Sequence, residues 1–383
     1  MDLSLNEDQL SFKKLAREFL DAEVVPYRGE WDRRESVDTA IIPKLGDLGF
    51  FGLTIPEEYG GLGGDYITYC IGMEELGRAD SSVRGIVSVS MGLVGKVILS
   101  HGTEEQKHRW LPGIATGRTL ACFGLTEPDN GSDAANLRTR AVRDGDDWVL
   151  NGAKIFITNG TWADVCLVFA RTGEPGPRGV SAFLVPTDLP GFGRQEIHGK
   201  LGLRGQATAE LSFDNVRVPA DAMLGAEGEG FKIAMHSLDK GRVSVGAGCV
   251  GIIQGCLEAV VDYSVQRRQF GRQLASFQLI QDMIAEISVE ADAARLLVWR
   301  AADLIERDQP FGTEASKAKY FASEAAVRAA NLAIQAFGGY GYVDEYPVQK
   351  YMRDARVMTL YEGTSQIQKL LIGRAETGVS AFL

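Results

Sequence analysis

The chain has 383 residues, of which 45% are apolar and 24% are charged. The length allows two or three domains or one large multi-layer unit, and the composition is that of a globular protein and argues against extensive disorder. The formal net charge of −11 argues against nucleic-acid binding, because an acidic surface repels phosphates. The four histidines are scattered and the five cysteines form no CxxC pair. We therefore expect no metal site and buried free thiols.

The first third of the sequence predicts helices. Asn6 and Gln9 have the spacing of a capping box, and Phe12, Leu15 and Phe19 follow on one helical face. The glycine-rich stretch "PEEYGGLGGD" has no GxGxxG spacing, so it does not indicate a dinucleotide-binding loop. We find no apolar run of membrane-spanning length and no signal or transit peptide. The expected location is therefore cytoplasmic, of the bacterial type.

The middle third predicts β-strands. Four stretches, "WVLNGAKIFITNG", "DVCLVFART", "VSAFLVPTD" and "TAELSFDNVRVP", are rich in Val, Phe, Ile and Thr and are bounded by Gly, Asn, Asp and Pro. Short strands at this spacing are typical of an antiparallel sandwich or barrel. We place this β-domain at residues 121–228.

The last third again predicts helices, arranged as a four-helix set. The first of them contains Gly248, Gly251 and Gly255 nearly on one side. Each glycine inside a helix costs about 0.5–1 kcal/mol relative to alanine, so a row of them indicates that something comes close to that face. Close packing of a neighbouring helix is the favoured interpretation, and direct contact with a cofactor is the alternative.

The octet "YEGTSQIQ" places a carboxylate, Glu362, directly before a predicted helix. Ser365 and Gln368 have the spacing of a capping box. A base at this point could remove a proton while free N–H groups of the helix terminus stabilise a developing negative charge. The octet alone favours a simpler interpretation, in which Glu362 only interacts with the helix dipole.

Three further motifs change this balance: "FGLTEPDNGS", "RRQFG" and "QAFGGYGY" precede the octet in that order. With this ordered set, the whole chain resembles the acyl-CoA dehydrogenase family. The resemblance implies an α+β multi-domain fold. It consists of an N-terminal α-helical domain (1–120), a central antiparallel β-sandwich or barrel (121–228) and a C-terminal four-helix bundle (229–383).

The resemblance also implies FAD as cofactor and dehydrogenation of an acyl-CoA thioester between its α and β carbons. Glu362 matches the family's catalytic base, which takes the α-proton while flavin N5 accepts the β-hydride. Some members carry the base on the earlier helix, where this sequence has Gly241. The backbone N–H of Glu362 would bind the thioester oxygen.

Site residues follow from the same resemblance. Flavin contacts are implied for Phe123, Leu125, Thr126, Gly131, Ser132, Phe156, Thr158, Arg267, Phe270, Gln278, Gln335, Gly338, Gly339, Thr364 and Gln366. Substrate contacts are implied for Ser132, Asp239, Arg242 and Gly363. The positions from Arg267 to Gly339 match residues that bind flavin across a subunit interface, which implies a homotetramer built as a dimer of dimers.

Two residues depart from the family pattern. Phe156 stands where many members have Trp, and Gln206 stands where Ser is common. The predicted helical segment "AARLLVWRAADL" resembles those of the short-chain and short-branched-chain members. The electron acceptor that the resemblance implies is an electron-transfer flavoprotein. Three alternatives stay open: a dehydrogenase of acyl–carrier-protein thioesters, an oxidase that uses O₂, and a flavin-free helical scaffold.

Overall fold

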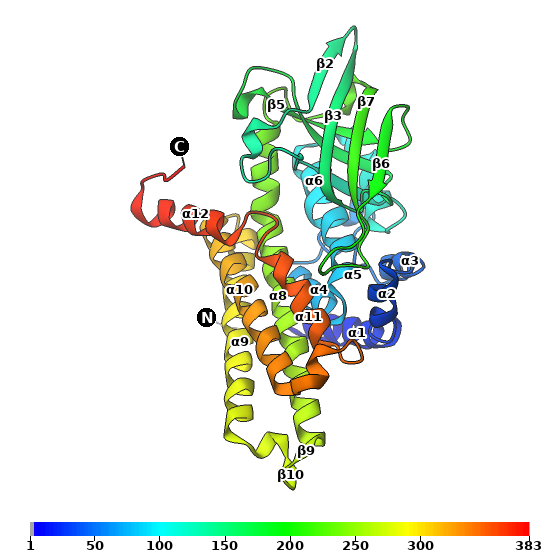
Figure 1. Ribbon diagram of the computed structural model, residues 1–383. Helices are drawn as coiled ribbons and strands as arrows, with labels where there is room; N and C mark the ends of the chain where they lie inside the picture. Colours follow the sequence, from blue (N-terminus) through cyan, green and yellow to red (C-terminus); the bar gives the residue numbers. More distant parts are fainter. Residues whose placement is uncertain (1–3, 383) are drawn as a thin grey trace.

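A computed structural model describes residues 4–382 of the chain. In Figure 1 the β-sheet lies at one end of the molecule and the long C-terminal helices extend away from it. The N-terminal helices pack along one side of both parts. One continuous core of buried apolar side chains joins the N-terminal helices to the C-terminal ones. The β-sheet has a second core of its own, which includes Trp148, Phe183 and Phe213.

The N-terminal region is helical, as the sequence predicts. Its helices are α1 (Glu7–Glu23), α2 (Arg28–Arg34), α3 (Ile41–Asp47), α4 (Tyr66–Ala79), α5 (Ser81–Val87), α6 (Lys96–His101) and α7 (Glu104–Ala115). The Asn6–Gln9 capping box of α1 is formed. Between α5 and α6 the helix continues through Ser88–Gly95 as a π-helical segment. Such segments are frequent at functional sites, and this one reaches the site described below.

The β-domain is one eight-stranded sheet. Its strands are β1 (Ala121–Gly124), β2 (Arg140–Asp144), β3 (Asp147–Thr158), β4 (Val165–Arg171), β5 (Val180–Pro186), β6 (Phe192–Glu196), β7 (Thr208–Pro219) and β8 (Met223–Leu224). The order is β6-β7-β3-β2-β4-β5-β8, and β1 lies beside β4. Most pairings are antiparallel, but β1 and β2 each pair with β4 in parallel, so the sheet is mixed.

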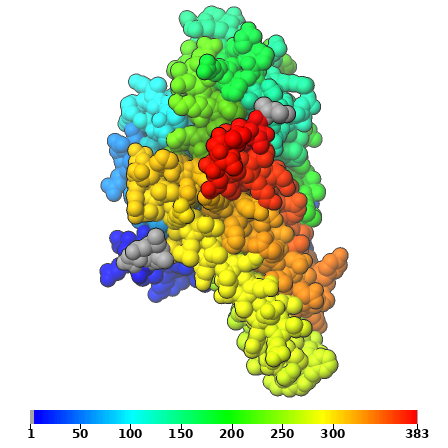
Figure 2. All heavy atoms as spheres, turned by 90° about the vertical axis from the view of Figure 1, so that its left-hand side faces the viewer, coloured from blue at the N-terminus to red at the C-terminus, as the bar shows by residue number. Residues whose placement is uncertain are grey.

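The C-terminal region is built on α8 (Gly230–Gln266), which runs from the sheet to the opposite end of the molecule (Figure 1). A hairpin of β9 (Arg268–Gln269) and β10 (Arg272–Gln273) follows. The remaining helices are α9 (Gln278–Glu306), α10 (Gly312–Phe337), α11 (Val348–Met358) and α12 (Ser365–Thr377). Figure 2 shows that the hairpin end projects beyond the rest of the chain.

The glycines of α8 serve close packing, as the sequence interpretation favoured. A Cβ atom at Gly251 would lie 2.0 Å from the carbonyl oxygen of Glu74 on α4, and one at Gly255 would lie 2.5 Å from the hydroxyl of Tyr351 on α11. At Gly248 the close neighbour is the side chain of Arg84. The helices can therefore approach α8 closely only because these positions lack a side chain.

One expectation about apolar runs is wrong. Two helices, Ser81–His101 and Gly230–Gln266, are long and apolar enough to cross a membrane by length and composition alone. Their most apolar windows are 94% and 78% buried inside the protein. These helices therefore form the core on which both helical regions pack. All five cysteines are buried as free thiols, as expected.

Candidate active site

The loop before α12 holds Glu362 in a strained conformation. The φ angles are 53° at Glu362 and 91° at Gly363, so two consecutive residues are left-handed. Non-glycine residues rarely adopt this region, and where they do the surrounding structure must hold them. A Cβ atom at Gly363 would lie 2.5 Å from Nε2 of Gln368. The positive φ favours glycine at position 363, and a larger residue there would also displace the amide of Gln368.

The helix cap differs by one residue from the sequence prediction. Thr364, not Ser365, is the N-cap of α12, and its side chain accepts a hydrogen bond from the N–H of Ile367. Gln368 does not complete a capping box. Its Nε2 instead donates to the carbonyls of Glu362 and Gly363, at 3.2 and 3.0 Å. The reason is the left-handed turn, which brings these carbonyls over the first turn of the helix.

The carboxylate of Glu362 points into the protein. Its Oε2 atom is buried and has no hydrogen-bond partner among the described residues. Burial raises the pKa of Glu362 above its ordinary value, and the cations of Arg84, Lys319 and Arg242 oppose that increase. A buried carboxylate without a partner is a stronger base than an exposed one, because desolvation disfavours its charged form.

Three buried cations surround this carboxylate. Arg84 comes from α5, and its Nη2 donates to the hydroxyl of Tyr361 at 2.7 Å. Lys319 comes from α10 and donates to the carbonyl of Gly363 at 2.8 Å, which fixes the loop. Burial lowers the pKa of Lys319 to about 8. Arg242 comes from α8 and forms an ion pair with Asp239, one turn earlier.

The β-domain contributes a second set of expected residues, on β1 and β3. Phe156 has a φ of 60° and its side chain is 65% exposed. It lies in a β-bulge, where the pairing of β3 with β7 shifts between Lys154 and Ile157. Bulges often redirect a side chain next to an active site. Two residues later, the hydroxyl of Thr158 accepts a hydrogen bond of 2.7 Å from Gln206.

The loop after β1 is held by a buried ion pair. Lys154 donates to Glu127 at 2.7 Å and to the carbonyl of Leu125 at 3.1 Å. Glu127 also accepts from the backbone N–H groups of Arg138 and Thr139. The pair thereby closes the turn that contains Thr126, Gly131 and the exposed Ser132.

The third set of expected residues lies at the far end of α8. Arg267 ends that helix, and its guanidinium lies over the ring of Tyr340. Phe270, at the hairpin turn, is 93% exposed. The other members are Gln278, Gln335, Gly338 and Gly339, at the adjoining ends of α9 and α10. Arg267 is 26 residues beyond Gly241, about 39 Å along the helix. One chain therefore does not bring this set together with Glu362.

Comparison with known proteins identifies the family. Its N-terminal domain model matches residues 6–118, its middle domain model 122–216 and its C-terminal domain model 228–377. The chain belongs to the acyl-CoA dehydrogenase family. Such enzymes are oxidoreductases whose cofactor is FAD.

Several relatives of this acyl-CoA dehydrogenase align over nearly all of it. An acyl-CoA dehydrogenase of Bacillus subtilis is 44% identical over 97% of this chain and 98% of its own. A short-chain specific enzyme of Clostridium acetobutylicum is 41% identical over 97% of this chain and 98% of its own.

Solved structures agree with this assignment. Butyryl-CoA dehydrogenase from Megasphaera elsdenii has a TM-score of 0.96 and 42% identity, covering 98% of this chain and 100% of its own. A chain in a structure of the electron transferring flavoprotein of Acidaminococcus fermentans has a TM-score of 0.97 and 44% identity, with the same coverage. Glutaryl-CoA dehydrogenase from Mycobacterium smegmatis with FADH2 has a TM-score of 0.95 and 37% identity, covering 99% and 97%.

The residues of this acyl-CoA dehydrogenase fit a flavin. The exposed ring of Phe156, turned outward by the bulge, offers an apolar plane to an aromatic ring system. The hydroxyl of Thr158 is held by the amide of Gln206, so its own proton remains available to an acceptor.

Sequence reasoning missed two site residues, Arg84 and Lys319. Each left a signal in the sequence. Arg84 is the only charged residue in the run "SSVRGIVSVSMGLVG". Lys319 lies on the face of α10 that carries the buried alanines Ala315, Ala318 and Ala322. A single cationic residue in an otherwise apolar or small-residue segment indicates a buried charge, and buried charges usually have a structural or functional role.

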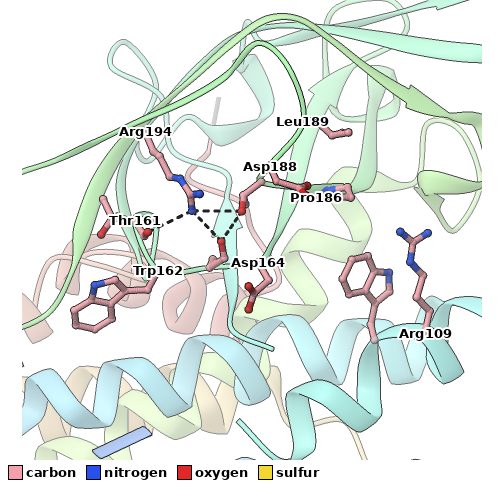
Figure 3. A pocket seen from close by; sticks show the side chains of 11 residues that line it. Arg109, Thr161, Trp162, Asp164, Pro186, Asp188, Leu189 and Arg194 are labelled. Carbon is pink, nitrogen blue, oxygen red and sulfur yellow. Dashed lines mark hydrogen bonds between the residues drawn. The ribbon is translucent and has the colours of Figure 1, made fainter. Parts of the chain in front are cut away.

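A surface pocket of about 610 Å³ lies elsewhere, between α7 and the ends of β3 to β6 (Figure 3). Arg194 lies within it and donates to the carbonyls of Thr161 and Ala163 and to the hydroxyl of Thr187. Its lining includes none of the expected flavin or substrate residues among the described part of the chain. The pocket is therefore separate from the site around Glu362.

Proposed function

We propose that the protein dehydrogenates a short acyl-CoA thioester, with Glu362 as the base that removes the α-proton. The observation that carries this proposal is the buried, unpartnered Oε2 of Glu362 among residues 4–382, held by a strained loop. FAD, when bound, supplies the acceptor for the β-hydride. The names of the relatives, butyryl-CoA dehydrogenase and short-chain specific dehydrogenases, support a short acyl group.

The environment of Glu362 suits proton removal from a weak carbon acid. Burial raises its pKa, which increases its basicity, and the three nearby cations keep the ionised form accessible. A dry site also strengthens every electrostatic interaction with the developing enolate. The backbone N–H of Glu362 is proposed to donate to the thioester oxygen, and such a donor contributes about 3–4 kcal/mol.

The other expected substrate contacts are assigned by position. Asp239 and Arg242 form their ion pair on the same stretch of α8 as Gly241, and Gly363 follows the base directly. Ser132 lies on the exposed loop after β1. We propose that the thioester and its pantetheine pass between these elements, with Glu362 on one side of the α-carbon and the flavin on the other.

The far set of residues supports an oligomer. Arg267 lies about 39 Å along α8 from Gly241, which faces Glu362, and Phe270 follows it in the hairpin at that far end. A hairpin tip with a 93% exposed Phe270 is suited to contact with another copy. We propose a homotetramer, a dimer of dimers, in which this set and its neighbours complete the flavin site of an adjacent subunit.

Electron transfer is proposed to use an electron-transfer flavoprotein. The match to a chain in a structure of such a protein from Acidaminococcus fermentans supports this acceptor.

The relatives' names differ in the acyl group, butyryl in one and glutaryl in another, so names alone do not choose between these two acyl groups.

The experiment is anaerobic titration of the FAD-loaded protein with short acyl-CoA thioesters. Loss of the oxidised flavin absorbance, with formation of the 2-enoyl-CoA product, is the expected result. Failure of every CoA thioester to reduce a bound flavin would contradict the proposal. Reduction by the corresponding acyl–carrier-protein thioester alone would instead identify a carrier-protein enzyme.

A further inference from the structure

Gln206 is a buried amide in the segment between β6 and β7. Its side chain is 4% exposed. Its Nε2 donates a hydrogen bond of 2.7 Å to the hydroxyl of Thr158, the last residue of β3. Its Oε1 is buried and has no hydrogen-bond partner among residues 4–382. The one side-chain hydrogen bond of Gln206 within the described chain therefore goes to a residue of the expected flavin site.

The segment that carries Gln206 is fixed against α11. The backbone N–H of Leu203 donates to the buried carboxylate of Asp354 at 2.7 Å. A Cβ atom at Gly202 would lie 2.2 Å from the carbonyl oxygen of Arg353, so the segment and the helix meet backbone against backbone. The side chain of Gln206 therefore begins from a well-held position, which is what precise placement of its amide requires.

A glycine of α5 provides the space for this amide. A Cβ atom at Gly85 would lie 1.9 Å from Oε1 of Gln206 and 2.8 Å from its Cδ. Oε1 thus lies against the helix, and Nε2 faces Thr158 on the other side. Any side chain at position 85 would push the amide away from its present place. The hydrogen bond to Thr158 therefore depends on two elements, α5 and the segment before β7.

This hydrogen bond limits what the hydroxyl of Thr158 can do. A hydroxyl has one proton and two lone pairs, and an amide nitrogen can only donate. Gln206 therefore occupies one lone pair of the Thr158 oxygen and cannot accept its proton. No hydrogen bond leads from that hydroxyl to another group of residues 4–382. Thr158 is half-buried, so its proton is left for a group that comes from outside the chain.

Reduction changes the hydrogen bonds that a flavin can make. The ring nitrogen that receives the hydride is an acceptor in the oxidised flavin and carries a hydrogen in the reduced one. A hydroxyl proton directed at this nitrogen therefore favours the oxidised form. The amide of Gln206 strengthens that effect, because hydrogen bonds in a chain polarise one another. It also occupies a lone pair of Thr158 that the reduced nitrogen could otherwise use.

We propose that Gln206 is a positioning residue of the flavin site, which directs the proton of Thr158 at the flavin and thereby favours its oxidised form. Gly85 acts through Gln206, because it leaves the space in which the amide lies. This inference rests on the proposed function, in which the flavin accepts the hydride. It adds the residue that adjusts how readily the flavin takes up electrons.

The midpoint potential of the bound flavin tests the inference without turnover. It is measured by reductive titration of the FAD-loaded protein against a dye of known potential. In Gln206→Met we expect the equilibrium to shift about three- to ten-fold toward reduced flavin, which is about 15–30 mV for a two-electron couple. Gln195→Met, at an exposed position of β6, is the matched control and should keep the wild-type potential.

A second pair of variants separates this role from a merely structural one. Adding Gln206→Met to Thr158→Val should leave the potential of Thr158→Val unchanged, because the amide acts only through the hydroxyl. Gly85→Ala should shift the potential in the same direction as Gln206→Met. It displaces the amide from another element, so it decides the matter if Gln206→Met does not retain FAD.

Three results would overturn the inference. They are an unchanged potential in Gln206→Met, an equal shift when Thr158 is already valine, and a shift to lower potential, which would mean that the amide presents its oxygen to Thr158. Because no acyl thioester is present, these results leave the proposed function intact. Failure of every thioester to reduce the wild-type flavin would instead contradict the proposed function and leave the measured potentials standing.

Discussion

Gly241 and Glu362 face each other across the site: a Cβ atom at Gly241 would lie 2.1 Å from Oε2 of Glu362. The same atom would lie 2.7 Å from the side chain of Leu93, in the π-helical segment. One point between α8 and the loop before α12 can therefore hold a single carboxylate. In this chain it comes from the loop, and α8 provides the space by having a glycine.

Gly241→Ala should therefore displace the base. The added methyl group cannot coexist with the carboxylate in its present position, so we expect at least a ten-fold slower anaerobic flavin reduction with FAD still bound. Gly373→Ala on α12 is the control, because nothing lies within 4 Å of that position. Equal reduction rates in the two variants would show that Glu362 does not need this space.

Lys319→Met should shift the pH dependence of flavin reduction. The ammonium group lowers the pKa of Glu362, so its loss raises that pKa further. Because the base must be ionised, the acidic limb of the rate profile should move to higher pH. Lys317 also lies on α10, but its amino group pairs with Glu376 of α12 at the surface. The Lys317→Met variant should therefore leave the pH profile unchanged. Identical profiles in both variants would argue against charge control by Lys319.

Lys154→Met tests the buried ion pair that holds the loop after β1. Removing Lys154 leaves the buried carboxylate of Glu127 without its cation, and breaking a buried pair in this way typically costs about 3–5 kcal/mol. We expect a clear drop in the denaturant midpoint. Lys107→Met breaks an exposed pair with Glu104 and should cost less than about 1 kcal/mol. Similar midpoints for the two variants would mean that the Lys154 pair does not stabilise the domain.

Phe270→Asp tests the proposed assembly. A charge at the tip of the hairpin should weaken contact between copies, because burying an unpaired carboxylate is costly. Light scattering should show smaller particles, and FAD should be lost on gel filtration. A wild-type protein that is monomeric yet retains FAD would contradict the cross-subunit site.

The sequence predicted features that depend on local pattern. The Asn6 cap, the order of helices and strands and the loop position of Glu362 all follow from periodicity and capping residues. It did not predict features that depend on distant partners. Arg84 donates a hydrogen bond to Tyr361, which is 277 residues away in the sequence. Gln206, in the segment between β6 and β7, donates one to Thr158 at the end of β3. The parallel pairing of β1 with β4 likewise could not be predicted, because the residue pattern of a strand does not indicate which strand it pairs with or in which direction.

The most direct test of the account is anaerobic flavin reduction in the Glu362→Gln protein, with glutaryl-CoA and butyryl-CoA as substrates. The amide has nearly the same shape but cannot accept the α-proton. The account predicts bound FAD, a spectral change on ligand binding and flavin reduction slower by at least about 10³-fold. Reduction at a rate near that of the wild type would show that another group is the base.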